Sequence, residues 1–256
     1  DSVRLNKEGF NPIKANLEKI KAIKDRKEYQ RVTAELDRKG ESTMMYAWGV
    51  GADQRNAGNN IVAISQAGLG LGTPEYYLNE DPQSKAVVGA YKTYLTKLFQ
   101  LVGYDAETAA KKVEAVMEIE NRIAKVSYDQ VKSRDINANY HKLTYAELIE
   151  QYPGIDWPTV FWVSGFPVFN EVDLGQPEPI HEVEKILADT DLDNLKSYAE
   201  IRIIAGASSC MSDEFRKAQF EFSQTLSGQP ADLPRWKRAN SLVNSVLSDA
   251  IGQMYC

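Results

Sequence analysis

The sequence is poor in the residues that most often build metal and redox sites. Its 256 residues contain only two cysteines, Cys210 and Cys256, and two histidines, His141 and His181. Two thiols are too few for a disulfide framework or a cysteine-rich zinc site, and they allow one bridge at most. Because free cysteines are commonly core residues, we expect Cys210 to be a buried structural thiol rather than a nucleophile.

The histidines do not form a zinc motif. His181-Glu182-Val183-Glu184-Lys185 resembles H-E-x-x-H only in part, because Lys185 stands where a second imidazole ligand is required. We therefore expect no metal or cofactor site in this chain. We expect His181 to be solvated near a helix start and His141 to bond to the backbone in a turn.

Long apolar runs and clustered positive charge are also missing. No apolar stretch approaches the roughly 18–20 residues that cross a bilayer, and we find no signal peptide at Asp1. The net charge is −6, with acidic and basic residues interspersed, which argues against a nucleic-acid partner. No Asn-x-Ser/Thr glycosylation acceptor occurs, and together with the scarcity of cysteine this suits a bacterial protein.

Most of the chain has the three- and four-residue apolar spacing of amphipathic helices. Asp81-Pro82 and Asp105 resemble helix starts, and Thr144 with Glu147 resembles a capping box. Met44–Val50 and Asn60–Gln66, separated by turn-forming residues, predict a β-hairpin, and Val168–Leu174 suggests one further short strand. We therefore predict a mainly α fold, a multi-helix globular lobe with one small β-hairpin.

Residues 66–78 depart furthest from ordinary composition, with glycines at positions 68, 70 and 72 followed by Pro74 and Tyr76-Tyr77. A dinucleotide-binding loop needs a different glycine spacing and a helix start, which Pro74 interrupts, and no lysine is present to make a P-loop. We expect instead that the glycines let the backbone lie close against a helix, where a Cβ would clash. The two tyrosines are expected to be half-buried.

The charged clusters suggest no catalytic pair. We expect the carboxylate pairs, Glu118 with Glu120 and Asp191 with Asp193, to lie on solvated helix faces. The basic run Arg235-Trp236-Lys237-Arg238 opens the last expected helix, residues 235–255, and opposes its macrodipole. Structural ion pairs and a buried Trp236 are therefore predicted there.

Three stretches nevertheless resemble the neprilysin and endothelin-converting-enzyme family of zinc metallopeptidases. The first is Gly68-Leu69-Gly70-Leu71 with Pro74 and Tyr76-Tyr77, after an Asp53-to-Asn56 turn; it is similar to the family's G-L-G-L-P-x-x-x-Y-Y, with Gly72-Thr73 added. The second, Arg134-Asp135 through Thr144, resembles R-D-x-x-x-x-Y-N-K-M-T with His141 in place of Asn. The third, Arg235 through Tyr255, resembles R-W-K-R-C…V-N…G-Q-x-Y-V, with Ala239 and Cys256 as departures.

The resemblance implies a particular place in a larger protein. Such enzymes have a zinc-binding catalytic lobe with H-E-x-x-H and a largely helical lobe that caps it and admits only short peptides. Residues 1–256 match the cap as a single lobe, and H-E-x-x-H does not occur in them. The expected partners are the catalytic lobe of the same polypeptide and short peptide substrates, with zinc in the parent enzyme and a location outside the cytoplasm.

Six residues are expected near the face between the lobes or toward substrate, because their polar and aromatic runs fit no amphipathic stripe: Asp53, Asn56, Tyr76, Tyr77, Arg134 and Asp135. Two other readings stay open. The chain could be a stand-alone helical module that binds peptides or proteins without catalysis. It could also be an independent hydrolase that uses Cys210.

Overall fold

The computed structural model describes residues 2–166 and 169–255. The N-terminal half contains three helices, a pair of strands, one short helix and two long helices. In order they are α1 (Ser2–Glu8), α2 (Asn11–Lys21), α3 (Arg26–Asp37), β1 (Tyr46–Asp53), β2 (Asn56–Gln66), α4 (Glu75–Leu78), α5 (Pro82–Leu101) and α6 (Ala106–Val126). The C-terminal half continues with η1 (Lys132–Arg134), β3 (Lys142–Thr144), α7 (Tyr145–Gln151), α8 (Trp157–Ser164), β4 (Glu171–Leu174), α9 (Pro177–Asp189), α10 (Leu192–Ala207), η2 (Ser208–Cys210), α11 (Asp213–Ser227), α12 (Arg235–Val246) and α13 (Ser248–Tyr255).

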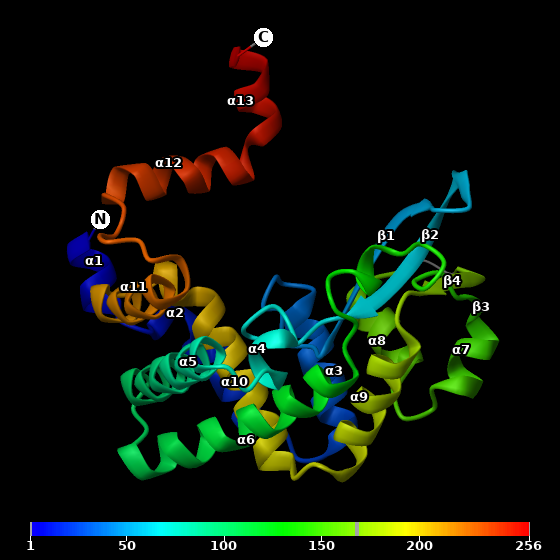
Figure 1. The fold of residues 1–256 in the computed structure, drawn as a ribbon, viewed down its shortest axis with the longest axis horizontal. Coiled ribbons are helices and arrows are strands. Elements are labelled where there is room, and N and C mark those ends of the chain that lie inside the picture. Colours follow the sequence, from blue (N-terminus) through cyan, green and yellow to red (C-terminus); the bar gives the residue numbers. More distant parts are fainter. Residues whose placement is uncertain (1, 167–168, 256) are drawn as a thin grey trace.

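The predicted mainly α fold is confirmed, and α10 is a central helix of the packed body (Figure 1). It contacts α2, α5 and α6. Because neighbours surround it, buried side chains lie all around its axis rather than along one stripe. They include Leu195, Tyr198, Ile201 and Ile204, together with the polar Glu200.

The predicted helix starts are also confirmed. The carboxylates of Asp81 and Asp105 accept hydrogen bonds from amides of the first turns of α5 and α6. Thr144 and Glu147 form the reciprocal capping box at the start of α7. These side chains satisfy amides that have no partner within the helix.

The sheet is larger than the predicted hairpin. Its four strands run in the order β1-β2-β4-β3, with the hairpin strands antiparallel from Tyr46 opposite Gln66. β4 pairs parallel to β2, with Val62 opposite Val172, and β3 closes the far edge. Of the suggested strand 168–174, residues 171–174 form β4, and Val168 lies outside the described residues.

The last predicted helix is divided. Leu247 leaves the helical conformation and separates α12 from α13, and Figure 1 shows both helices rising away from the rest of the molecule. The predicted burial of Trp236 is wrong, because α12 buries no side chain and Trp236 remains 63% exposed. The predicted ion pairing is correct for Arg238, whose Nη1 lies 2.5 Å from Oδ2 of Asp232.

The prediction for Cys210 is wrong as well. This thiol is exposed in η2, while Ser208 takes the buried position of the same turn. Cys256 lies outside the described residues. No helix in the described part of the chain is both long enough and apolar enough to cross a membrane.

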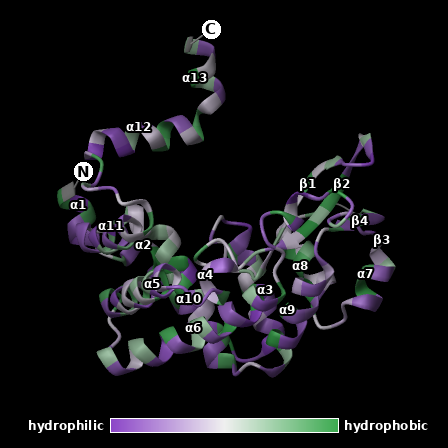
Figure 2. Ribbon diagram, viewed as in Figure 1, coloured by the Kyte–Doolittle hydropathy of each residue, from purple (hydrophilic) through white to green (hydrophobic). Residues whose placement is uncertain are grey.

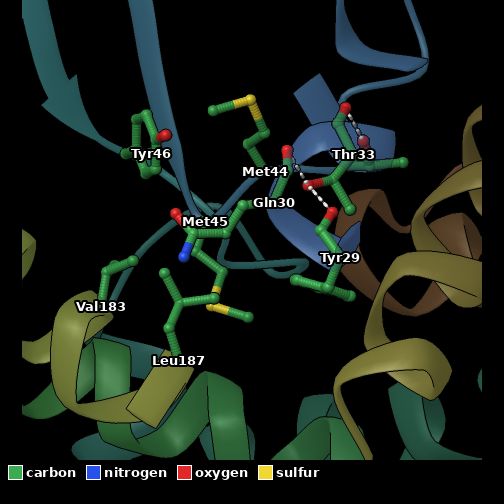
Figure 3. Close-up of a pocket in the computed structure, with 9 residues that line it drawn as sticks. Tyr29, Gln30, Thr33, Met44, Met45, Tyr46, Val183 and Leu187 are labelled. Atoms are coloured by element: carbon green, nitrogen blue, oxygen red, sulfur yellow. Dashed lines mark hydrogen bonds between the residues drawn. The ribbon is translucent and has the colours of Figure 1, made fainter. Parts of the chain in front are cut away.

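A small cavity lies where α3, the chain leading into β1 and α9 meet. Tyr29 and Thr33, Met44 and Met45, and Val183 with Leu187 line it, one pair from each of these segments (Figure 3). Its volume is about 20 Å³, which is the size of a single water molecule. This cavity is therefore too small to be a ligand site.

Candidate functional site

The glycine-rich segment lies against the helical core at two of its three glycines. A Cβ on Gly68, whose φ is +97°, would lie 2.8 Å from the Tyr198 hydroxyl. A Cβ on Gly70 would lie 1.7 Å from the Tyr91 hydroxyl. At both positions the predicted close approach is confirmed, whereas Gly72, with φ +80°, has open space around it and serves the turn.

Glu120 of α6 fixes this segment in place. Its carboxylate accepts hydrogen bonds from the hydroxyls of Tyr77 at 2.7 Å and Tyr91 at 3.0 Å, and from the amide of Gly70 at 3.2 Å. The Tyr77 hydroxyl in turn accepts a bond from the Leu71 amide at 3.0 Å. One carboxylate therefore joins α4, α5 and the glycine-rich segment to α6.

Burial controls the acidity of this group. The side chain of Glu120 is 0% exposed, and this burial raises its pKa to about 7, although bonds from Tyr77, Tyr91 and Gly70 and the charge of Arg202 act in the opposite direction. Burial beside this carboxyl also raises the pKa of the Tyr77 and Tyr91 hydroxyls. Both phenols are therefore neutral donors at physiological pH.

A second polar cluster lies at the end of the hairpin. Asp53 is 2% exposed, and its Oδ1 accepts from the Arg55 amide and the Tyr140 hydroxyl, each at 2.9 Å. Lys142 lies between Asp53, at 3.6 Å, and Glu171, at 2.7 Å. The bond from the Arg55 amide is the main reason why the pKa of Asp53 is lowered.

Arg55 joins this hairpin end to the segment that follows η1. Its guanidinium lies 4.6 Å from the centre of the Tyr140 ring and donates to Asn137 Oδ1 at 3.2 Å. The backbone of Asp135 is held in the same segment, because Asn139 Nδ2 donates to its carbonyl at 2.7 Å. Hairpin and segment therefore form one polar surface.

The six residues singled out from the sequence fall into two groups. Asp53 and Asn56 lie at the hairpin end, which Arg55 connects to the segment of Arg134 and Asp135. Tyr76 and Tyr77 lie in α4 and are half-buried, as predicted, with Tyr77 bonded to Glu120. Asn56, Arg134 and Asp135 are exposed.

Sequence reasoning missed Glu120. It was expected on a solvated face, and that expectation is wrong for Glu120 although Glu118 is exposed. The available signal was its position, because Glu120 lies four residues after Val116 and three before Ile123, on the buried stripe of α6. Glu200 was missed for a similar reason, and its buried carboxylate is paired with Lys112 at 2.8 Å.

The histidines are placed largely as expected. His141 Nδ1 lies 3.0 Å from the Leu174 carbonyl, and His181 is exposed on α9, where its ring stacks on Tyr152. Among the described residues, no group of three or more His, Cys, Asp or Glu side chains could hold a metal ion. These residues therefore do not fit a zinc centre.

Comparison with known proteins identifies the chain's relatives. The model of Peptidase family M13, in its N-terminal part, matches residues 1–256. Bovine endothelin-converting enzyme 1 is 31% identical over 214 residues, which cover 80% of this chain and 28% of that protein. The human enzyme is 30% identical over the same length. The chain therefore spans less than a third of the length of these relatives.

Solved structures show the same fold. The open state of Mycobacterium tuberculosis zinc metalloprotease Zmp1 matches 100% of this chain with 40% of its own, at a TM-score of 0.91 and 27% identity. Its inhibitor complex matches with a TM-score of 0.93. PepO from Lactobacillus rhamnosis has a TM-score of 0.85 at 20% identity, which supports the fold alone. This chain belongs to peptidase family M13 and corresponds to the N-terminal, helical part of a neprilysin-like metallopeptidase.

Proposed function

We propose that this chain is the non-catalytic helical lobe that covers the zinc-containing lobe of a peptide-hydrolysing M13 enzyme and limits access to it. The chain corresponds to about 40% of solved relatives that are described as zinc metalloproteases. Its own described residues hold no group of side chains suited to a metal. The zinc ligands are therefore assigned to a second lobe of the same polypeptide.

One observation carries this proposal, namely the uncovered apolar surface of α12 and α13. Six large apolar side chains of residues 235–255 are exposed, and Figure 2 shows these helices apart from the packed body. An apolar surface of this kind marks a site of protein contact. Its members are Trp236, Leu242, Val243, Val246, Leu247 and Met254.

The polar surface at the hairpin end supplies the residues proposed to face the second lobe or the peptide. Asn56, Arg134 and Asp135 are exposed and available for contact. Asp53 is buried, so its proposed role is to fix the turn that presents Asn56. Tyr76 and Tyr77 are proposed to act by shaping the glycine-rich segment. By relation to the family, we also place the enzyme outside the cytoplasm.

The same apolar surface would also suit a stand-alone module that binds a separate protein. Reading the coding sequence beyond the codon for Cys256 distinguishes the two functions. The lobe proposal expects an H-E-x-x-H motif in the same polypeptide. A stop codon directly after Cys256 would contradict it and favour the module.

In the polypeptide that carries both lobes, Trp236→Ser is expected to loosen their packing. Cleavage of a peptide of about 40 residues should then rise relative to cleavage of one of about eight residues, because a loosened lobe excludes long chains less well. Trp162→Ser is the matched control, since Trp162 is 84% exposed on α8 and lies outside this surface. Equal length preference in the two variants would reject the gating role.

A further inference from the structure

A second cavity lies between the glycine-rich segment, the chain that leaves α6, and α10. Its volume is about 360 Å³, and its lining includes Gly68, Thr73, Ser127, Gln130, Ser133 and Arg202. Arg202 is the only charged residue in this lining. The cavity is therefore large enough for a small organic ligand and has a single positive charge in its wall.

Arg202 has most of its donors unused. Its Nε donates weakly to the Ser42 carbonyl at 3.4 Å, and its terminal nitrogens make no hydrogen bond within the described residues. Within residues 2–166 and 169–255 the guanidinium forms no ion pair within 4.0 Å, and it is partly buried. The charge of Arg202 also acts on the buried Glu120, although the two groups form no direct ion pair. A half-buried guanidinium without a direct ion-pair partner can donate to an oxyanion, since its planar fork matches a carboxylate.

Other donors belong to the same lining. The amides of Gly68, Leu69 and Thr73 make no hydrogen bond within the part of the chain that is described, although Gly68 is buried. The Thr73 hydroxyl and the Gln130 carboxamide also have no partner there. Buried backbone amides are nearly always paired, so the unpaired amide of Gly68, in a lining that also contains Arg202, indicates a place for an acceptor.

The walls are fixed before any ligand arrives. Gln66 donates to the Tyr128 carbonyl at 2.9 Å and accepts from the Tyr128 amide at 2.7 Å, which ties the chain after α6 to the end of β2. The Tyr198 hydroxyl of α10 donates to the Gly68 carbonyl at 2.9 Å. Because all three walls are joined, binding needs little further ordering.

We propose that this cavity binds a carboxylate, held by Arg202 and by donors of the glycine-rich segment. The chemistry is that of a small carboxylate anion with apolar or amide substituents, because the lining beyond Arg202 is neutral. The carboxylate that occupies the cavity belongs either to a free small acid or to an acidic side chain from elsewhere in the polypeptide. This proposal is independent of the proposed gating role, because its test measures binding to the 256-residue chain alone.

The test is a titration of the isotope-labelled chain with N-acetylglycine, and separately with its neutral amide, followed by NMR. We expect saturable shifts at the amides of Gly68, Leu69 and Thr73 with the acid and none with the amide. Arg202→Gln should weaken binding at least about tenfold, as loss of a charge-assisted contact does. Arg235→Gln is the control, because Arg235 is an exposed arginine outside the lining, and it should bind like the wild type.

Each outcome decides the proposal. No saturable shift up to about 50 mM acid, equal shifts with the amide, or unchanged affinity in Arg202→Gln would overturn it. If Arg202→Gln fails to fold, the acid-and-amide pair on the wild type and the milder Arg202→Lys variant decide instead. Binding to this chain that disappears in the two-lobed polypeptide would identify an acidic side chain as the natural occupant, whereas binding to both would identify a free acid.

Discussion

At the scale of single residues, Glu120 has the widest structural role. Its carboxylate is fully buried and receives three hydrogen bonds, from two tyrosine hydroxyls and one glycine amide. An ionised carboxylate is purely an acceptor and suits three donors, yet burial disfavours its charge. The two effects oppose each other, and burial is the larger, since the pKa rises to about 7.

The raised pKa predicts how stability depends on pH. In the unfolded chain Glu120 titrates near pH ~4.3, so between about pH 4.5 and 7 the folded state binds more protons. The free energy of unfolding should therefore fall as pH rises through this window, by about 3 kcal/mol from this group alone. Urea unfolding at a series of pH values would measure this fall, with Glu120→Gln as comparison. A wild-type pH profile parallel to that of Glu120→Gln would contradict the assignment.

Gly70 gives a steric prediction. The Cβ of Gly70→Ala would overlap the Tyr91 hydroxyl, so we expect a loss of at least about 2 kcal/mol of stability. Gly89→Ala is the matched control, because Gly89 lies inside α5 with no atom within 4 Å of the added Cβ. This control should gain about 0.5–1 kcal/mol from helix propensity. Thermal unfolding of both variants checks that the melting temperature falls for Gly70→Ala and rises for Gly89→Ala.

The residue-scale predictions from sequence succeeded where the chemistry is local. Close packing at Gly68 and Gly70 was predicted, because few other reasons place glycines so densely. The buried Glu120 and the exposed Cys210 were not predicted, because each was judged from residue type rather than from its position on a helix. Arg202 was missed for a different reason, since its cavity is formed by segments far apart in the sequence.

At the scale of secondary structure, the starts of long helices were predictable, whereas short strands were predicted only in part, since β4 was suggested as part of residues 168–174 and β3 was not. The aspartate caps Asp81 and Asp105 marked where α5 and α6 begin. β3 has three residues and β4 has four, too few to show a period of two. The parallel pairing of β4 with β2 is also non-local, so no turn between them announces it.

The uncovered state of α12 leads to a prediction about the 256-residue chain. Trp236→Ala should leave its stability within about 0.5 kcal/mol, because Trp236 lies on a helix that buries no side chain. Trp157→Ala should cost about 3–5 kcal/mol, because Trp157 is fully buried. Denaturant unfolding of each variant measures these two changes in the free energy of unfolding. An equal cost for both substitutions would show that α12 packs against the body.

At the scale of the whole molecule, composition alone led only to a mainly α globular domain. Family membership came from the resemblance of three sequence blocks in order, and the match to the M13 model over residues 1–256 confirmed it. The fold brings the Asp53 turn of the first block next to the second block, where Arg55 and Tyr140 meet, but it leaves the third on the separate helices α12 and α13. The three sequence blocks that resemble the family therefore lie on two different surfaces. The turn of the first block shares one with the second block, and the third block forms the other.

The parallel pairing of β2 with β4 has a consequence during synthesis. Val62 and its partner Val172 are separated by 110 positions, so one edge of β2 has no partner until that much more chain has been made. At ordinary elongation rates this interval is on the order of 5–20 seconds. An unpaired strand edge is a template for wrong pairing. The nascent chain therefore passes through a period in which shielding of β2 by a chaperone would favour correct folding over aggregation.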